Sequence, residues 1–127
     1  MTPEGRVKAA VDALLKHWKS YKHKPVGNGM GEPALDYHVG HQGFYAAIET
    51  KANGGEPTVR QTRTMHNVVD AGNSLFLIES TTGLDIQELA NWLKYPVRSY
   101  VSCSAQKWLN DHPRKVNEPC NVGSRNS

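Results

Sequence analysis

The sequence predicts an α/β domain in which a helix, three strands, a second helix and a fourth strand follow one another. Three observations support this. Apolar residues recur at helical spacing from Val7 to Trp18, and strand-like segments separated by glycine-rich turns follow. A capped helix then precedes the apolar strand 75–78. A strand, a helix and a strand in this order form a right-handed crossover between parallel strands, so the sheet is expected to be mixed.

The first helix is expected to begin after Thr2, because threonine is a favoured N-cap and Pro3 suits the first helical position. Its helically spaced apolar residues predict the buried face: Val7, Ala10, Val11, Leu14, Leu15 and Trp18. Glu4 falls on the same face. We interpret Glu4 either as a favourable charge at the helix N-terminus or as a carboxylate directed at the sheet and a metal ion.

Three strands are predicted next, over residues 21–26, 34–39 and 44–51. The turn 40–43 joins the second strand, which carries Asp36, to the third, which ends in Glu49 and Lys51. Residues two apart on a strand point to the same face, so Glu49 and Lys51 are expected to share a face.

Asp36, Glu49 and Lys51 form the candidate reaction centre. Two carboxylates about 4 Å apart in an effective dielectric near 20 repel by about 4 kcal/mol. A divalent cation such as Mg²⁺ removes this cost because it binds oxygen ligands, and a lysine beside it can hold an attacking water or a phosphate oxygen. These residue types therefore predict metal-assisted hydrolysis of phosphodiester bonds.

The second helix is expected to start at Thr58, with Gln61 completing a capping box, and to stop at Gly72. Gln61 also lies four residues before Met65, on the buried stripe of this helix. Its side chain is therefore assigned either to the cap or to a hydrogen bond with the lysine, a water or a phosphate.

Beyond the strand 75–78, the pattern of residues 84–93 predicts another amphipathic helix, 97–103 an edge strand and 106–109 a short helix. The chain is expected to form one domain with a polar, flexible tail. The predicted bounds are 1–112 for the domain, 1–80 for its core, 81–112 for a C-terminal extension and 113–127 for the tail.

The net charge of +3, from 15 basic and 12 acidic residues, suggests a polyanionic partner. The candidate phosphate contacts are Lys22, Lys24, Arg60 and Arg63. Ordinary solvated faces are the alternative. No signal peptide or membrane-length apolar segment is recognisable, so a cytoplasmic protein without membrane contact is expected. His38 and His41 are interpreted as exposed polar residues, because the sequence offers no third ligand for zinc.

These motifs resemble the VRR-NUC family of the PD-(D/E)XK nuclease superfamily, in its short stand-alone phage form. The similarity covers about residues 1–80 and is carried by the segments 2–5, 31–36, 43–51, 57–61, 71–72 and 75–78. One departure is visible, because Leu35 stands where the family has a proline directly before the aspartate. That proline shapes the turn and does not bind metal.

The resemblance implies a restriction-endonuclease-like αβββαβ core with extra C-terminal helices, and an endodeoxyribonuclease that depends on Mg²⁺ or Mn²⁺. Asp36 and Glu49 would bind the metal, with Glu4 completing its ligands. Lys51 would orient the water, and Gln61 would fix Lys51 or a substrate oxygen.

Short members of the family resemble Holliday junction resolvases, so the implied partners are branched or junction DNA and a second copy of the chain. A two-fold dimer would place two such sites on two strands. The alternative is a catalytically silent module of the same fold that binds DNA or a host protein.

Overall fold

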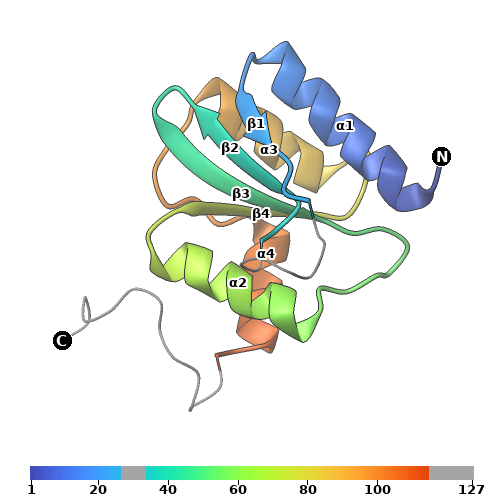
Figure 1. Ribbon diagram of the computed structural model, residues 1–127, viewed down its shortest axis with the longest axis vertical. Helices are drawn as coiled ribbons and strands as arrows, with labels where there is room; N and C mark the ends of the chain where they lie inside the picture. Colours follow the sequence, from blue (N-terminus) through green and yellow to red (C-terminus); the bar gives the residue numbers. More distant parts are fainter. Residues whose placement is uncertain (27–33, 115–127) are drawn as a thin grey trace.

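The computed structural model describes residues 1–26 and 34–114. Its elements are α1 (Pro3–His17), β1 (Tyr21–His23), β2 (Tyr37–His41), β3 (Phe44–Thr50), α2 (Val59–Asp70), β4 (Ser74–Ile78), α3 (Leu84–Lys94) and α4 (Cys103–Asp111) (Figure 1). The predicted order αβββαβ, followed by extra C-terminal helices, is confirmed. Most of the predicted tail, residues 115–127, lies outside the described residues, whereas Arg114 bonds to Asp70 on α2.

The four strands form one sheet in the order β1-β2-β3-β4. β1 pairs with β2 and β2 with β3 in antiparallel fashion, whereas β3 and β4 are parallel. The mixed sheet is therefore confirmed. Its parallel pair follows from the crossover through α2, which returns the chain to the same end of the sheet before β4 begins.

Helices cover both faces of the sheet (Figure 1). On one face, α1 and α3 enclose a core that includes Leu15, Ile48, Phe76 and Leu93, all with 0% exposure. On the other face, α2 and α4 pack through Met65 and the buried residues of a second cluster: Leu35, Ala47, Leu75, Leu77, Ala105 and Leu109. All five residues of β4 are buried, as expected for a strand covered on both faces.

The predicted helix starts are confirmed by their caps. The Thr2 hydroxyl accepts a hydrogen bond from the N–H of Gly5 (3.0 Å), with Pro3 at the first helical position. Thr58 and Gln61 form the predicted capping box. Gly72 has a φ of +85°, a left-handed conformation that favours glycine, directly after the C-cap of α2.

Residues 97–103 do not form the predicted edge strand. Among the described residues, their strand-like pairing with the sheet is limited to one parallel bridge between Leu75 and Val101, and side-chain hydrogen bonds of Ser74 and Ser102 add to it. Ser99 has a φ of +57°, which interrupts the extended backbone. The hydroxyl of Ser102 accepts from the N–H of Ala105, and this N-cap starts α4 at Cys103. The short helix predicted at 106–109 is therefore longer, and the overlooked signal was the N-cap serine.

β1 ends three residues earlier than predicted, and β2 begins and ends later than the predicted 34–39, so Asp36 lies one residue before it. The interpretation of His41 as exposed is wrong. Its ring is 4% exposed and bonds to the Ser20 hydroxyl (2.9 Å) and the Leu93 carbonyl (2.7 Å), so it joins the end of α1 to α3. Because the Leu93 carbonyl only accepts, Nε2 of His41 is the donor in that bond.

The segment after Ser80 is tied to the sheet through buried acids. Asp85 on α3 accepts from the N–H of Glu79 (2.9 Å) and the hydroxyl of Ser104 (2.6 Å). Glu88 accepts from the hydroxyl of Tyr100 and the N–H of Cys103. Within the described part of the chain, no helix is long and apolar enough to cross a membrane.

Candidate active site

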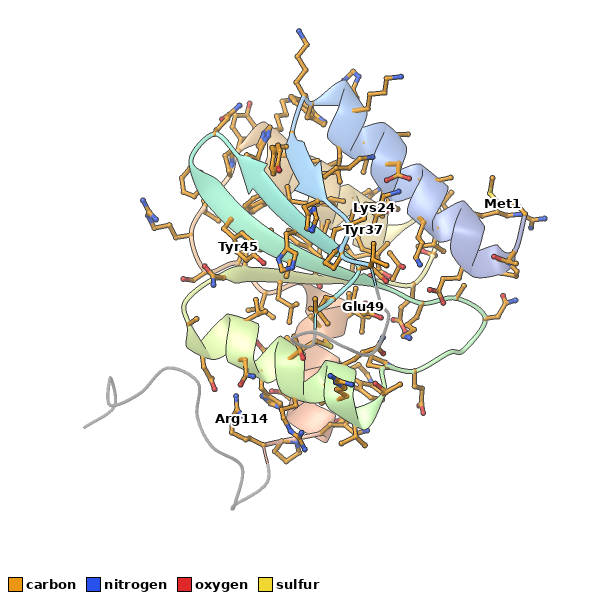
Figure 2. All side chains as sticks on the ribbon, in the orientation of Figure 1. Met1, Lys24, Tyr37, Tyr45, Glu49 and Arg114 are labelled. Carbon is orange, nitrogen blue, oxygen red and sulfur yellow. The ribbon has the colours of Figure 1, made fainter. Side chains whose placement is uncertain are left out.

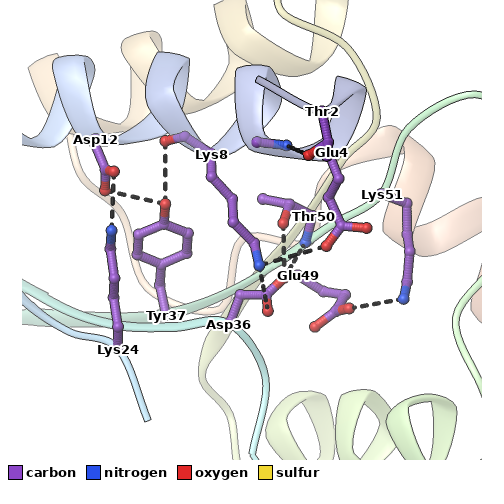
Figure 3. Close-up of polar contacts among 11 residues, drawn as sticks. Thr2, Glu4, Lys8, Asp12, Lys24, Asp36, Tyr37, Glu49, Thr50 and Lys51 are labelled. Carbon is purple, nitrogen blue, oxygen red and sulfur yellow. Dashed lines mark hydrogen bonds and ion pairs between the residues drawn. The ribbon is translucent and has the colours of Figure 1, made fainter. Parts of the chain in front are cut away.

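Asp36 is held at the end of β3 by Thr50. Its Oδ2 accepts from the N–H of Thr50 (2.9 Å) and from the Thr50 hydroxyl (2.7 Å). Tyr37 pairs with Ile48, so the residue before β2 falls beside Glu49 at the end of β3. The hairpin register therefore brings the two predicted carboxylates together (Figure 3).

Glu49 is 1% exposed, and its two carboxylate oxygens have different surroundings. Oε2 lies 3.4 Å from Nζ of Lys51. Oε1 is the one buried side-chain N or O atom among the described residues that has no hydrogen-bond partner. Burial, followed by repulsion from Asp36, raises the pKa of Glu49 to about 7, although Lys51 acts to lower it.

Lys51 follows β3 directly and extends its pairing, because its N–H donates to the carbonyl of Ile78 (3.0 Å). Its side chain is 15% exposed and lies on the same side as Glu49, as predicted from their spacing. The amine thus stands between a buried carboxylate and the solvent, where a phosphate oxygen can reach it.

Glu4 approaches the same place from α1, and Lys8 lies between it and Asp36. Nζ of Lys8 is 3.4 Å from Oε2 of Glu4 and 3.6 Å from Oδ1 of Asp36 (Figure 3). Partial burial acts to lower the pKa of Lys8, but the charges of Asp36 and then Glu4 prevail and raise it. Lys8 was not among the predicted site residues, although its position four residues after Glu4 places both side chains on one face of α1.

These acids meet the requirements of a magnesium site only in part. No group of three or more His, Cys, Asp or Glu side chains is arranged to hold a metal within the two described ranges. Mg²⁺ is commonly bound through one or two carboxylates, with water and substrate phosphate completing its ligands. Asp36 and Glu49 fit that pattern, because Oε1 of Glu49 is a buried oxygen without a partner.

The side chain of Gln61 completes the capping box at the start of α2. Its Oε1 accepts from the N–H of Thr58 (2.9 Å), while the Thr58 hydroxyl accepts from the N–H of Gln61 (3.0 Å). Across the described residues, Gln61 makes no hydrogen bond to Lys51. The sequence left two roles open for Gln61, and the structure shows the capping role. Its assignment to catalysis stays a prediction.

The four candidate phosphate contacts fall into two groups. Lys22 and Lys24 both bind Asp12 on α1, at 2.8 and 2.9 Å. Burial acts to raise the pKa of Asp12, but hydrogen bonds from both lysines and from Tyr37 outweigh it and lower that pKa. Asp12 therefore offsets one of these two positive charges. The other group, Arg60 and Arg63, is exposed on the first turns of α2.

An open hollow of about 420 Å³ lies between the sheet and α2. Tyr45 and Ala47 contribute to it from β3, the strand that carries Glu49 on the same face (Figure 2). The ring of His38 lies 5.8 Å from that of Tyr45 and 6.1 Å, stacked, from that of His23. The remaining lining residues are Ala34, Leu35, Thr64, Asn67, Val68, Ala71 and Asn73.

The comparisons with known proteins identify the fold. No protein-family model matches the sequence, and no curated protein matches it. A solved structure described as a VRR_NUC domain superposes with a TM-score of 0.59, covering 76% of this chain and all (100%) of its own, at 19% sequence identity. The resemblance predicted from the motifs is thus confirmed at the level of the fold: the chain has the α/β fold of a VRR_NUC domain.

Proposed function

We propose that this protein is a metal-dependent DNA endonuclease that hydrolyses phosphodiester bonds and prefers branched or junction DNA. The observation that carries the proposal is the end of β3, where the buried Glu49 with its unpartnered oxygen lies beside Asp36 and Lys51. A fold rarely leaves a buried carboxylate oxygen unsatisfied unless a ligand completes it. The VRR_NUC fold supports nuclease chemistry for these residues.

Asp36 and Glu49, with Glu4 from α1, would hold the divalent cation, Mg²⁺ or Mn²⁺. When bound, the cation supplies an activated water and neutralises charge on the scissile phosphate. Thr50 keeps Asp36 in place, since it donates two hydrogen bonds to Oδ2 and leaves Oδ1 facing the site. Lys51 would donate from Nζ to the attacking water or to a phosphate oxygen and stabilise the charge that develops there.

The DNA strand would pass along the open hollow between β3 and α2, toward the end of β3 that carries Glu49. Tyr45, which lines this hollow, lies four residues before Glu49, about 13 Å away at ~3.3 Å per residue. That span corresponds to a few nucleotides at ~3.4 Å per nucleotide of one strand. Arg60 and Arg63 on α2 would contact phosphates beside this path, with Lys22 and Lys24 at a more neutral flank.

The motif resemblance further supports a symmetric homodimer that makes paired cuts on Holliday junction-like DNA. It also supports a phage origin, with the protein made in the host cytoplasm. A dimer would present two copies of the Glu49 site to two strands of one junction.

The experiment incubates the purified protein with a four-way junction, a nicked circle and a linear duplex, each with Mg²⁺, Mn²⁺ or EDTA. We expect metal-dependent cleavage, fastest on the junction. Lys51→Ala should abolish product but keep DNA binding, whereas Lys16→Ala, at an exposed site on α1, should cut like the unaltered protein. Equal cleavage by the Lys51 variant would show that this lysine is not part of the reaction.

A non-cutting DNA-binding or host-protein-binding module is the second candidate. It is favoured by the lack of a three-ligand metal cluster within the described parts of the chain. A gel shift of the junction without product, under all three metal conditions, would select this candidate over the nuclease.

A further inference from the structure

Lys8 brings a positive charge to the oxygens that face the proposed metal position. Oδ2 of Asp36 is occupied by two hydrogen bonds from Thr50. The remaining oxygen, Oδ1, lies 3.6 Å from Nζ of Lys8, and the same Nζ lies 3.4 Å from Oε2 of Glu4. Figure 3 shows the amine between the two acids. Lys8 thus contacts both carboxylates in the place where a cation would join them.

The two lysines of the site differ in how firmly they are held. The side chain of Lys51 is 15% exposed beside a buried acid, whereas that of Lys8 is 40% exposed and contacts an acid with 41% exposure. An exposed ion pair of the second kind changes an equilibrium constant by about fivefold or less. Lys8 also stands on a flexible four-carbon stem, so its amine can turn into solvent at small cost.

We propose that Lys8 is the resident counter-ion of this site and that a divalent cation displaces it on binding. The inference rests on the proposed function only for the assignment of a cation to Asp36, Glu49 and Glu4. An ammonium and a divalent cation do not share Oδ1 of Asp36, because like charges at that distance repel more strongly than the ion pair holds the lysine. Lys8 therefore keeps the acids together before metal binding and lowers the affinity for metal.

The test measures Mn²⁺ binding without DNA, by titration calorimetry and by the electron paramagnetic resonance signal of free Mn²⁺. Lys8→Met and Lys8→Gln should lower the Kd for Mn²⁺ by about five- to tenfold, because competition and residual repulsion are both removed. Lys8→Arg keeps the charge and should bind Mn²⁺ like the unaltered protein. Lys16→Met, on the same helix, removes one charge away from the site and serves as the matched control.

Thermal unfolding provides a second readout. In EDTA, the neutral variants should melt slightly below the Lys16 control, because Glu4 and Asp36 lose their shared partner. Mn²⁺ should then raise their Tm by more than it raises that of the control. A Kd for Lys8→Met equal to or higher than that of Lys16→Met overturns the proposal, as does a complete lack of Mn²⁺ binding by all folded variants.

The outcomes separate this inference from the nuclease assignment. If Lys8→Met binds Mn²⁺ more tightly than Lys16→Met but the unaltered protein cuts no DNA, the role of Lys8 as counter-ion is supported and the nuclease assignment is refuted. A protein that cuts DNA, with Lys8→Met and Lys16→Met binding Mn²⁺ equally, keeps the nuclease and refutes the role of Lys8.

Discussion

Glu49 and Glu88 are both buried glutamates, with 1% and 7% exposure, but their surroundings differ. Both oxygens of Glu88 accept from the N–H of Cys103, and Oε2 also accepts from the hydroxyl of Tyr100. Glu49 has an ion pair on one oxygen and no hydrogen-bond partner on the other. The first acid joins α3 to the start of α4, whereas the second is left in a state that a ligand would complete.

The comparison shows that burial alone does not distinguish a structural acid from a functional one. A buried carboxylate stabilises a fold when donors satisfy it, and it destabilises the fold when they do not. The absence of donors at Oε1 of Glu49, together with repulsion from Asp36, distinguishes this carboxylate from that of Glu88 and supports its assignment to the proposed site.

The largest expected difference between the two acids is in cleavage. Glu49→Gln should lower the initial rate of junction cleavage in Mg²⁺ by about a hundredfold or more, because it removes a charged ligand and charge stabilisation at the reacting phosphate. Glu88→Gln should cut at the rate of the unaltered protein below its Tm. Glu56→Gln, an exposed acid in the loop after β3, is the control. Undiminished cleavage by Glu49→Gln would refute the site.

The pH dependence of stability should also separate the two acids. The folded-state pKa of Glu49 is raised to about 7, so between about pH 4.5 and 7 the folded state binds more protons than the unfolded state. Stability should therefore fall as pH rises through this window, by roughly 3 kcal/mol at most, and level off above it.

Urea unfolding in EDTA at pH 5 and pH 8 measures this effect. The stability of Glu49→Gln should not decrease between pH 5 and pH 8, and at pH 8 it should exceed that of the unaltered protein. Glu88→Gln should show the same decrease as the unaltered protein. Identical pH profiles for the unaltered protein and Glu49→Gln would contradict the raised pKa.

Removal of the satisfied acid should mainly lower stability. Glu88→Ala leaves the Tyr100 hydroxyl and the Cys103 N–H without their acceptor, so the free energy of unfolding should fall by about 2–3 kcal/mol. Chemical denaturation measures the loss, with Glu56→Ala as the exposed control. A loss below about 0.5 kcal/mol, the usual range for surface changes, would show that Glu88 does not hold α3 and α4 together.

The smallest expected effect comes from a single donor to Glu88. Tyr100→Phe removes one hydrogen bond but leaves the backbone N–H of Cys103 in place, so stability should fall by about 1 kcal/mol. The pKa of Tyr100 is raised to about 12, first by this hydrogen bond and then by burial. In Glu88→Gln, ultraviolet titration should find the Tyr100 pKa lower; an unchanged value would argue against the bond.

Much of the site followed from local rules of the sequence. The period of two along a strand placed Glu49 and Lys51 on one face, and the motif pointed to Asp36 and Glu4 as their partners. The caps at Thr2 and Thr58 were equally local, because each needs only the next few residues. The structure has these caps and brings the four charged residues to one end of the sheet.

Other features were not predictable because their partners are distant in sequence. The charge on Lys22 and Lys24 is offset by Asp12 only once β1 lies beside α1. Residues 97–103 alternate like a strand, but the cap at Ser102 and the left-handed Ser99 end the extended run. His41 was predicted to be exposed, but in the fold it is buried and hydrogen-bonded to Ser20 and to the Leu93 carbonyl.

The sequence by itself determined the order of elements, the starts of α1 and α2 and the residue types at the end of β3, because periodicity and capping act over a few residues. Only the tertiary structure decided which carboxylates are satisfied. Glu49 kept an unpartnered oxygen, Glu88 gained donors from a later segment, and Lys8 came to lie between Glu4 and Asp36. These outcomes depend on how helices dock on the sheet, and docking is governed by contacts between residues far apart in the chain.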